Sequence, residues 1–386
     1  MTQITIESKD FNRAIGVVSK VINKRSTFPI LENVLLSLEG GRFYLTGSNS
    51  EAWGKLRLQE DTIALIDGKD FDKICLPTEI IKQILGNCPD QRLVCDIDSE
   101  GSMMQVKHQT GHFSVPVTSA AEYPNMPTQE KMECQFEVDS AWLVPRVKAS
   151  KICVDTNILR PQMGNIALVA DHEGLDLVAT DGQLLYKDRL QVGLGTGFMT
   201  GEPQTVLLHQ SVFDIVATAF QSTEKVTIKA TPTNVMLCSE DFTLSYRPVD
   251  GRYPNYNSVI PKQQPHHVTV CVDSFVAALK RVAIFASNSS NLVILKWEGG
   301  NIILDADDVD YSHSASETVA PAGEENNMPD GFKIGFKAAS AISLIGCITT
   351  DNAVLEFSDR SRPITLREED ANSHLVLLQM PMVINE

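Results

Sequence analysis

Two histidines stand at a spacing that could bind a metal ion. His108 and His112 are four residues apart, as in a zinc site on one face of a helix. The residues around them alternate as in a strand, a turn and a second strand, and the glutamate that such a zinc site requires is missing. We therefore interpret this segment as an exposed hairpin and predict no metal.

Two other stretches resemble loops that bind ions or phosphates. The acidic run at residues 305–310 begins like a calcium loop, but Asp310 stands where glycine is needed and Ser316 where glutamate is needed. Residues 193–197 (GLGTG) are rich in glycine, yet the Gly-Lys-Ser/Thr of a phosphate-binding loop does not follow them. We expect a solvated strand end at the first place and a loop at the second.

No catalytic centre can be recognised in the sequence. It contains no Gly-x-Ser-x-Gly elbow, and no serine or cysteine has an identifiable base to activate it. The eight cysteines form no Cys-x-x-Cys pair, which predicts reduced, mostly buried thiols. One alternative stays open, a hydrolase or transferase that uses Asp181 and Asp250 as paired carboxylates. Both follow strands and precede glycine, as turn-forming aspartates do, so we predict a binding protein, not an enzyme, with no cofactor.

The elements that would position any such site recur three times along the chain. Each copy contains a strand, an amphipathic helix, a glycine-turned hairpin and a second helix, and the first helices begin near Phe11, Trp142 and Phe275. The Tyr-Pro-Asn segments at Tyr123 and Tyr253 lie 130 positions apart. A period of this length is typical of tandem domains, not of a solenoid. We predict three α+β domains, residues 1–128, 129–262 and 263–386, each with two helices packed on antiparallel sheets.

Composition narrows the class of protein. The chain has 386 residues, 43% of them hydrophobic, and no apolar run as long as a membrane span. Its first residues enter a strand pattern directly, so we expect no secretory signal and a cytoplasmic location. The net charge of −16 argues against a nucleic-acid partner, because phosphates are bound by Lys and Arg. That argument uses the total charge and ignores where the charges lie.

Basic residues of the first helices are placed away from the apolar stripes that begin at Phe11 and Phe275. These basic positions are Lys9, Arg13, Lys20 and Lys24 in copy one, Arg146, Lys148 and Lys151 in copy two, and Lys280 and Arg281 in copy three. In copy two they are spread more widely, and Pro145 should kink the helix or delay its start. Such faces also occur on ordinary solvated helices. Their recurrence in three copies favours a shared surface for phosphates.

Four segments carry a resemblance to a known family. They are residues 28–35 (FPILENVL), 178–185 (VATDGQLL), 249–262 (VDGRYPNYNSVIPK) and 380–382 (MPM). In this order they resemble the bacterial sliding clamps, the beta subunits of DNA polymerase III, and the resemblance covers the whole chain. It implies a head-to-tail homodimeric ring of six domains, with helices lining a central hole and sheets on the outer wall. Such a ring encircles duplex DNA without reading its sequence. It holds the replicative polymerase, the clamp loader and other clamp-motif proteins on the template, without catalysis.

The resemblance also assigns residues to three surfaces. A partner-peptide pocket between the second and third domains is implied at Met163, Thr180, Gly182, Gln183, Leu184, Leu185, Pro254, Val259, Leu378, Met380, Pro381 and Met382. DNA contacts are implied at Arg25 and Asn157, to which helix geometry adds Lys20, Lys24, Arg146, Lys148, Lys151, Lys280 and Arg281. Ring closure is implied at Phe113 and Val115 on the first domain and at Ile284 and Phe285 on the third.

The pocket of this chain departs from the family pattern. The family usually has His-Arg-Leu after Thr-Asp-Gly, where this chain has Gln183, Leu184 and Leu185. Ser258 stands at a usually basic position, and Val383 takes the place of an arginine after the last methionine. Apolar, flexible methionines suit a groove that accepts several linear motifs, so we expect a pocket with an altered preference. A peptide-binding scaffold that never encircles DNA is the second alternative.

Overall fold

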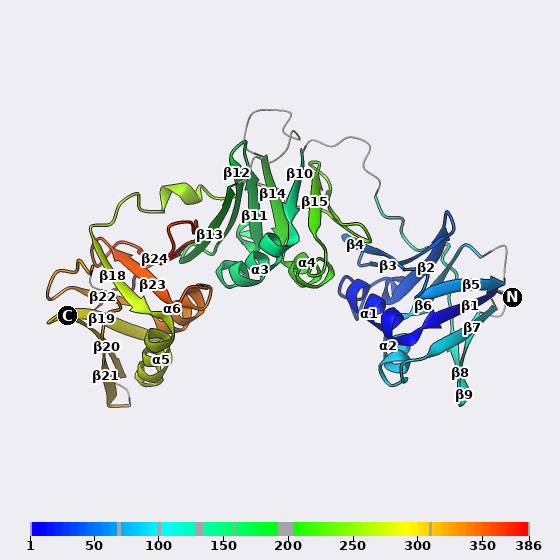
Figure 1. Cartoon of the computed structure of the whole chain (residues 1–386), viewed down its shortest axis with the longest axis horizontal. Helices are drawn as coiled ribbons and strands as arrows, with labels where there is room; N and C mark the ends of the chain where they lie inside the picture. Colours follow the sequence, from blue (N-terminus) through cyan, green and yellow to red (C-terminus); the bar gives the residue numbers. More distant parts are fainter. Residues whose placement is uncertain are drawn as a thin grey trace. The chain divides into compact units, whose positions relative to one another are not determined.

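The chain forms two compact units. The computed structural model describes residues 2–67, 71–98, 102–127, 134–157, 159–191, 204–308, 311–323 and 325–384. Of these, unit 1 comprises the residues up to Pro145 together with 211–248, and unit 2 comprises the remainder (Figure 1). The glycine-rich stretch 193–197, the boundary at residue 128 and Asp310 lie outside the described residues. The three-domain division therefore stays a prediction.

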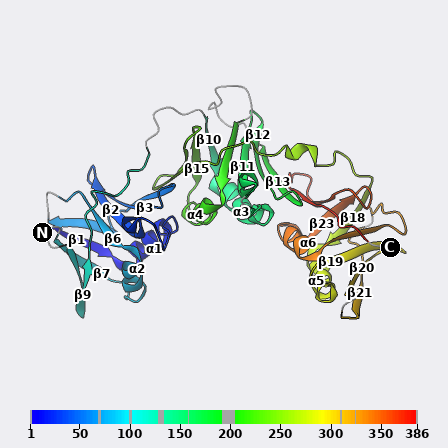
Figure 2. The same cartoon turned by 180° about the vertical axis from the view of Figure 1, so that it is seen from behind.

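Unit 1 combines two antiparallel sheets with short helices. Its elements are β1 (Thr2–Glu7), α1 (Ser8–Val18), η1 (Pro29–Glu32), β2 (Asn33–Glu39), β3 (Arg42–Ser48), β4 (Ala52–Arg57), β5 (Ile63–Asp67), β6 (Lys73–Pro77), α2 (Thr78–Gly86), β7 (Arg92–Asp98), β8 (Met103–His108), β9 (Gly111–Pro116), β10 (Cys134–Asp139), η4 (Gln210–Val212), α4 (Phe213–Ala219), β15 (Lys225–Ala230), β16 (Val235–Cys238) and β17 (Phe242–Tyr246). Its described strands order as β5-β1-β7-β8-β9 and as β10-β15-β16-β17-β4-β3-β2-β6. Helix α1 lies along α2 and packs on β3 and β4 (Figures 1 and 2).

Unit 2 repeats this plan. Its elements are η2 (Lys151–Cys153), η3 (Pro161–Gly164), β11 (Asn165–Ala170), β12 (Gly174–Thr180), β13 (Leu184–Gln191), β14 (Gln204–His209), η5 (Tyr256–Ser258), β18 (His266–Cys271), α5 (Val272–Val282), η6 (Ala283–Phe285), β19 (Leu292–Glu298), β20 (Asn301–Asp308), β21 (His313–Val319), β22 (Lys333–Lys337), α6 (Ala338–Ile345), β23 (Asn352–Phe357), β24 (Ile364–Glu368) and β25 (Val376–Gln379). Its described strands order as β14-β11-β12-β13-β25-β24-β23-β18 and as β21-β20-β19-β22. Helix α5 packs on α6 and on β20 and β21. The predicted α+β class with antiparallel sheets is confirmed.

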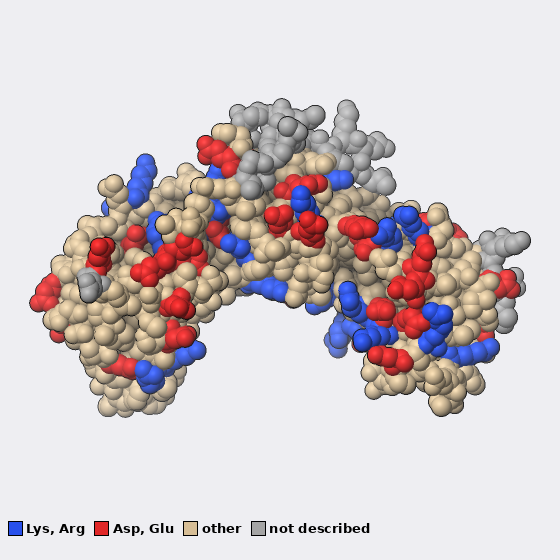
Figure 3. Space-filling view, viewed as in Figure 1, with Lys and Arg blue, Asp and Glu red and all other residues tan. Residues whose placement is uncertain are grey.

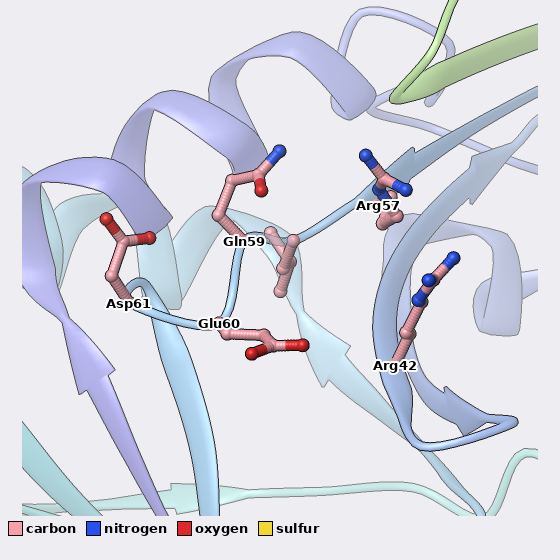
Figure 4. Close-up of a pocket in the computed structure, with 6 residues that line it drawn as sticks. Arg42, Arg57, Gln59, Glu60 and Asp61 are labelled. Atoms are coloured by element: carbon pink, nitrogen blue, oxygen red, sulfur yellow. The ribbon is translucent and has the colours of Figure 1, made fainter.

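Each long sheet joins strands from two copies of the sequence repeat. In unit 1, β17 of the second copy pairs with β4 of the first, and Arg57 closes this joint by donating to Asp241 at 2.7 Å and to Glu240 at 3.1 Å. Gln59 donates to the second oxygen of Asp241 at 2.9 Å. A polar hollow of about 380 Å³ lies beside this joint, with Arg42 and Arg57 extending from adjacent strands (Figure 4). Because the Arg57 charge is already matched by two carboxylates, we interpret the hollow as part of the joint.

The glycine-turned hairpins are confirmed in two copies by the same backbone geometry. Gly40 and Gly41, between β2 and β3, have φ of +57° and +80°, and Gly299 and Gly300, between β19 and β20, have +57° and +79°. Two consecutive residues with positive φ make the tight turn that matches the twist of paired strands. In the middle copy the carboxylate of Asp171 instead accepts the backbone N–H groups of Glu173 and Gly174 in the turn. The His108–His112 segment is likewise the β8–β9 hairpin.

The first helix is shorter than its pattern predicts. Phe11, Ile15 and Val18 form the buried stripe as expected. After Val18 the backbone N–H groups of residues 20–22 bond three residues back instead of four, which ends the α-helix in tight turns. The prediction that Lys20 and Lys24 belong to the helical face is therefore wrong. Both are exposed, in the segment that follows the helix.

Helix α3 (Ser140–Ser150) begins five residues before Pro145, so the expected delay of its start is also wrong. Leu143 and Val147 are buried, as the pattern predicts. All eight cysteines lie in described residues and carry free thiols, four of them buried. Among the helices in the described ranges, none combines the length and apolar character needed to cross a membrane. Within those ranges no three His, Cys, Asp or Glu side chains are grouped to hold a metal ion.

Candidate functional site

The turn between β12 and β13 is fixed by its own side chains. Thr180 donates its hydroxyl to the Leu184 carbonyl at 2.7 Å and accepts the Gly182 N–H at 3.1 Å. One oxygen of Asp181 accepts the N–H groups of Gln183 at 2.8 Å and Leu184 at 2.6 Å. Gly182 has φ of +88°, which L side chains rarely adopt. Asp181 therefore forms the turn, because its carboxylate accepts two of the backbone N–H groups in it.

A second segment, η3, brings Met163 against this turn. The side-chain amide of Asn165 donates to the carbonyls of Pro161 at 2.6 Å and Gln162 at 3.1 Å, which holds η3 at the start of β11. A Cβ at Gly182 would lie 3.5 Å from the Met163 methyl group. Behind the turn, the Tyr253 hydroxyl accepts the Thr180 N–H at 3.0 Å.

Arg160 is a neighbour that sequence reasoning did not include in the pocket. Its guanidinium lies 4.0 Å from the Met163 sulfur and would lie 3.5 Å from a Cβ at Gly182. The preceding Leu159 is 83% exposed, the kind of apolar surface residue that marks contact sites. In the sequence, Arg160 could have been found as an arginine that follows an apolar residue, just before the Pro-Gln-Met segment.

The chain's last strand completes this surface. Strand β25 pairs with β13, so that Leu378 faces Leu185 across the ladder. The Met380 N–H then donates to the Gln183 carbonyl at 2.8 Å, and the Met382 N–H to Gly335 at 2.7 Å. These bonds hold the Met-Pro-Met segment beside the turn of residues 180–184.

The predicted pocket residues divide into a buried frame and an exposed lining. Thr180, Leu184, Leu185 and Leu378 are at most 8% exposed, so their role is to support the backbone. The remaining members are partly or fully exposed: Met163, Gly182, Gln183, Pro254, Val259, Met380, Pro381 and Met382. Val383 adds an apolar side chain that is 86% exposed. The site can thus offer apolar contact with few charges, which suits a peptide segment better than a reaction.

The residues predicted to contact DNA differ in how exposed they are. Lys20, Arg25, Lys148, Asn157 and Lys280 are exposed, whereas Lys151 is half-buried. Figure 3 shows Lys and Arg side chains gathered over α1 in unit 1, with acidic side chains beside them. Lys24 forms an ion pair with Glu79 at 3.7 Å. Because both side chains are largely exposed to solvent, this ion pair is weak.

Two of the predicted arginines are held by carboxylates. Arg146 donates to Asp188 at 2.5 Å, and Asp188 is only 7% exposed. Burial raises the pKa of Asp188 although Arg146 favours its charged form. Arg281 donates to Glu317 at 3.0 Å, and this bond lowers the Glu317 pKa. Both guanidinium charges are therefore partly neutralised within unit 2.

Exposed aromatic and apolar side chains lie on one edge strand, β9, and on η6 beside another edge strand, β21. In the described part of unit 1, β9 is the last strand of its sheet, and its Phe113 is 36% exposed and stacks on His108 with ring centres 4.8 Å apart. Val115 on the same strand is only 1% exposed. In unit 2, β21 is an edge strand, and the neighbouring Ile284 and Phe285 are 73% and 37% exposed. Long edges of this kind readily pair with another chain.

Comparisons with known proteins agree over the full chain. The model of the N-terminal domain of the DNA polymerase III beta subunit matches residues 2–127, and the model of its C-terminal domain matches residues 257–383. The beta sliding clamp of Caulobacter vibrioides is 24% identical, over 98% of this chain and 99% of its own length. That of Escherichia coli K12 is 22% identical over the same shares.

Solved structures share the fold. A DnaN sliding clamp from Pseudomonas aeruginosa bound to griselimycin superposes with a TM-score of 0.89 at 21% identity, covering 99% of this chain and 100% of that one. The DNA polymerase III beta subunit from Thermotoga maritima gives a TM-score of 0.87 at 21% identity, covering 100% of both chains. At these identities the structural likeness establishes the fold, while the family models carry the assignment.

Proposed function

Because the chain belongs to the family of the DNA polymerase III beta subunit, the bacterial sliding clamps, we propose that it acts as a processivity factor. In this role it forms a ring around duplex DNA in the cytoplasm and holds the replicative polymerase on its template. The observation that carries the proposal is Met380, exposed and fixed by its backbone beside the turn of residues 180–184, in a chain that matches the family at both ends. The clamp binds and positions partners and catalyses no reaction.

Ring closure is proposed to join β9 of one protomer to β21 of another in a head-to-tail homodimer. Support comes from the exposure of Phe113, Ile284 and Phe285 at two different edges of the chain. Contacts between unlike edges form a closed ring when the rotation between protomers closes. Val115 would support this interface from beneath, because it is almost fully buried within its own protomer.

The DNA-facing surface is proposed to consist of Asn157 and of the basic residues that follow or lie on α1, α3 and α5. Lys20, Lys24, Arg25, Lys148, Lys151, Asn157 and Lys280 are its principal members. Arg146 and Arg281 would add less net charge because Asp188 and Glu317 are bonded to them. Lysine and arginine contacts to phosphates do not depend on base sequence, so a ring with this lining can slide.

The partner site is proposed at the surface lined by Met163, Gln183, Val259, Met380 and Met382. Its methionines adapt to different apolar side chains, as in other surfaces that accept several linear motifs. Gln183 offers an uncharged hydrogen-bond donor and acceptor at a position where the family usually has histidine. We therefore expect partner peptides bound here to depend mainly on apolar side chains. The clamp loader and further replication proteins would share this site with the polymerase.

The two alternatives are less well supported. A hydrolase built on Asp181 and Asp250 is disfavoured because Asp181 accepts two backbone N–H groups with one oxygen. A peptide-binding scaffold that never encircles DNA would keep the Met380 surface and would not need the exposed edges or basic segments. Neither alternative predicts a protein that is held on circular DNA by topology, so topology is the decisive test.

The experiment loads the protein, with a clamp loader, onto a nicked circular plasmid and passes the mixture through a sizing column in high salt. A ring stays on the circle because it is held by topology, and it is lost after the plasmid is linearised. Simple surface binding would be lost in high salt from both forms. Release from the circle and the linear form to the same extent would contradict the proposal and favour the scaffold.

A further inference from the structure

A buried carboxylate in unit 2 is bonded to the segment that carries Val259, one of the residues of the proposed partner site. Asp176 lies on β12 and is 5% exposed. One of its oxygens accepts a hydrogen bond from the Tyr256 hydroxyl at 3.0 Å, across 80 positions of sequence. Tyr256 begins η5, the short helical turn that precedes Val259. Asp176 therefore ties β12 to a wall of the partner site.

Two cations of the neighbouring strand β13 bind the same carboxylate. The Lys187 ammonium lies 3.2 Å from the Asp176 oxygen that accepts the tyrosine hydroxyl. Arg189 donates to the other Asp176 oxygen at 2.9 Å. Lys187 also contacts η5 itself, because it donates to the side-chain oxygen of Asn257 at 3.4 Å and lies 5.4 Å from the centre of the Tyr256 ring. We call Asp176, Lys187, Arg189 and Tyr256 the Asp176 network.

The hydroxyl and the ring of Tyr256 contact the sheet in different ways. The ring packs on the buried cluster of Ala167, Val178 and Leu207. Apolar contacts of this kind have no preferred direction, so they hold η5 against the sheet without fixing its place along it. Burial raises the Tyr256 pKa, so the hydroxyl stays protonated and donates to Asp176. This directional bond determines where η5 lies.

The backbone of η5 connects the position of Tyr256 to that of Val259. The Val259 N–H donates to the Tyr256 carbonyl at 3.3 Å, and the Ser258 N–H donates to the Asn255 carbonyl at 3.3 Å. These bonds close a single tight turn between the tyrosine and the valine. Val259 is 49% exposed, so it offers an apolar contact whose place depends on this turn. A displacement of Tyr256 would therefore displace Val259.

The charges of the Asp176 network favour a role in positioning over a role in stability. Moving an ion pair out of water costs about as much as the pair gains, so buried ion pairs add little net stability. They do supply directional bonds, and two of those described here end on η5. Arg189 also donates to both oxygens of Asp171, at 2.8 and 2.9 Å, in the turn between β11 and β12. Asp171 thus provides a matched control, a carboxylate that binds the same arginine and belongs to another turn.

We propose that Asp176 is a positioning residue for partner binding and that it fixes Val259 through the Tyr256 hydroxyl. The inference rests on the partner site proposed above, and it adds a buried charged residue that sets the affinity of that site without lining it. The partners concerned are peptides that place an apolar side chain against Val259. Their binding should depend on Asp176 although they do not contact it.

The test compares full-length variants by fluorescence anisotropy, with a labelled peptide that carries the clamp-binding segment of the replicative polymerase. Asp176→Asn keeps the shape of the side chain and removes its charge, and it should weaken peptide binding about tenfold. Tyr256→Phe keeps the ring and removes the hydroxyl, and it should weaken binding about fivefold, because hydrogen bonds to charged groups are among the stronger ones. Asp171→Asn should lower the thermal unfolding temperature and bind the peptide as the wild type does.

A double variant separates positioning from a general loss of stability. If Asp176 acts through the tyrosine hydroxyl, Asp176→Asn combined with Tyr256→Phe should bind as weakly as Asp176→Asn alone, whereas independent effects would multiply to about fiftyfold. In the free protein, the methyl NMR signals of Val259 should shift in both single variants and stay in place in Asp171→Asn. If Asp176→Asn does not fold, Tyr256→Phe and its Val259 signals decide the question.

The inference is overturned if the folded variants of Asp176 and Tyr256 bind the peptide as tightly as the wild type. It is also overturned if Asp171→Asn weakens binding to the same extent, or if the two effects multiply in the double variant. A wild-type protein that binds no peptide would refute the partner site itself, and the inference would fall with it.

Discussion

The Tyr253→Phe substitution probes how the partner site is held in place. The Tyr253 hydroxyl accepts the Thr180 N–H at 3.0 Å, and its ring packs on the buried cluster of Ala167, Val178 and Leu207. Burial raises the Tyr253 pKa, so the hydroxyl is neutral at physiological pH. Phenylalanine keeps the ring and leaves the Thr180 N–H without its acceptor.

The expected magnitude follows from that single bond. Leaving a buried N–H unsatisfied costs about 1–3 kcal/mol in unfolding free energy. Thr180 begins the turn that carries Gly182 and Gln183, so part of the cost should appear as displacement of the turn. A peptide would then have to restore the turn when it binds, and we expect about tenfold weaker binding, equal to about 1.4 kcal/mol. Fluorescence anisotropy with a labelled clamp-motif peptide measures this change.

Unit 1 offers a matched control. Tyr123 occupies the corresponding place in the first copy, and its hydroxyl donates to the Thr46 carbonyl at 3.2 Å. Its ring packs on a buried cluster that includes Leu31 and Cys75. Tyr123→Phe should lower the thermal unfolding temperature and leave peptide binding unchanged. The reasoning is refuted if Tyr253→Phe binds peptide normally, or if the two variants weaken binding equally.

Three further predictions concern the other surfaces. Ile284→Asp places a charge on the proposed ring interface and should shift the protein from dimer to monomer in analytical ultracentrifugation, whereas an unchanged mass would remove Ile284 from that interface. Charge reversal of Lys24 and Arg25 should weaken DNA retention, measured as the amount of protein that can be loaded onto nicked circular DNA, while peptide binding stays intact, and equal loss of both would show that the two surfaces are not separate. Bonding to Lys107 and Gln3 lowers the Asp96 pKa, so its stabilising effect is present above the ordinary pKa and is lost as pH falls through the lowered value. Asp96→Asn should therefore reduce thermal stability at neutral pH and make acid destabilisation shallower, and an unchanged acid profile would contradict this account.

Local rules predicted the elements whose causes are local. The paired glycines at Gly40 and Gly299 produce the positive φ values that their hairpins require, and the apolar spacing from Phe11 identified a buried helical stripe. The same apolar spacing predicted a helix that continues past the end of α1, because Val21 remains buried after the helix has become a series of tight turns. Apolar periodicity shows which side chains are buried. Because side chains can stay buried beyond the last residue of a helix, periodicity does not show where the helix ends.

Charge placement was predicted less well because ion pairs are formed by residues far apart in the sequence. Arg146 and its partner Asp188 lie on α3 and β13, and Arg281 and Glu317 lie on α5 and β21. A helical wheel treats these arginines as free cations. The fold reduces their expected contribution to phosphate binding, and it leaves Lys148 and Lys280 exposed.

The turn that frames the partner site occurs in both units with the same bonding. In unit 1, Ser50 has φ of +75° and donates its N–H to the Ser48 hydroxyl at 3.1 Å, while Asn49 accepts the next two N–H groups. The Arg247 N–H donates to the Glu51 carbonyl at 2.9 Å, as Met380 does to Gln183 in unit 2. The backbone framework was therefore repeated together with the rest of the domain.

What differs between the two turns is the set of side chains placed on this framework. Arg247 is exposed where unit 2 has Met380, and Leu31 is 2% exposed where unit 2 has the half-buried Met163. At the unit 1 turn a buried leucine and an exposed arginine therefore take the places of the two methionines. If the framework were sufficient for binding, each chain would bind two peptides. Because Met163 and Met380 have no methionine counterpart at the unit 1 turn, we expect one peptide per chain, and a measured stoichiometry of two by calorimetry would show that the backbone turn, not the methionines, carries recognition.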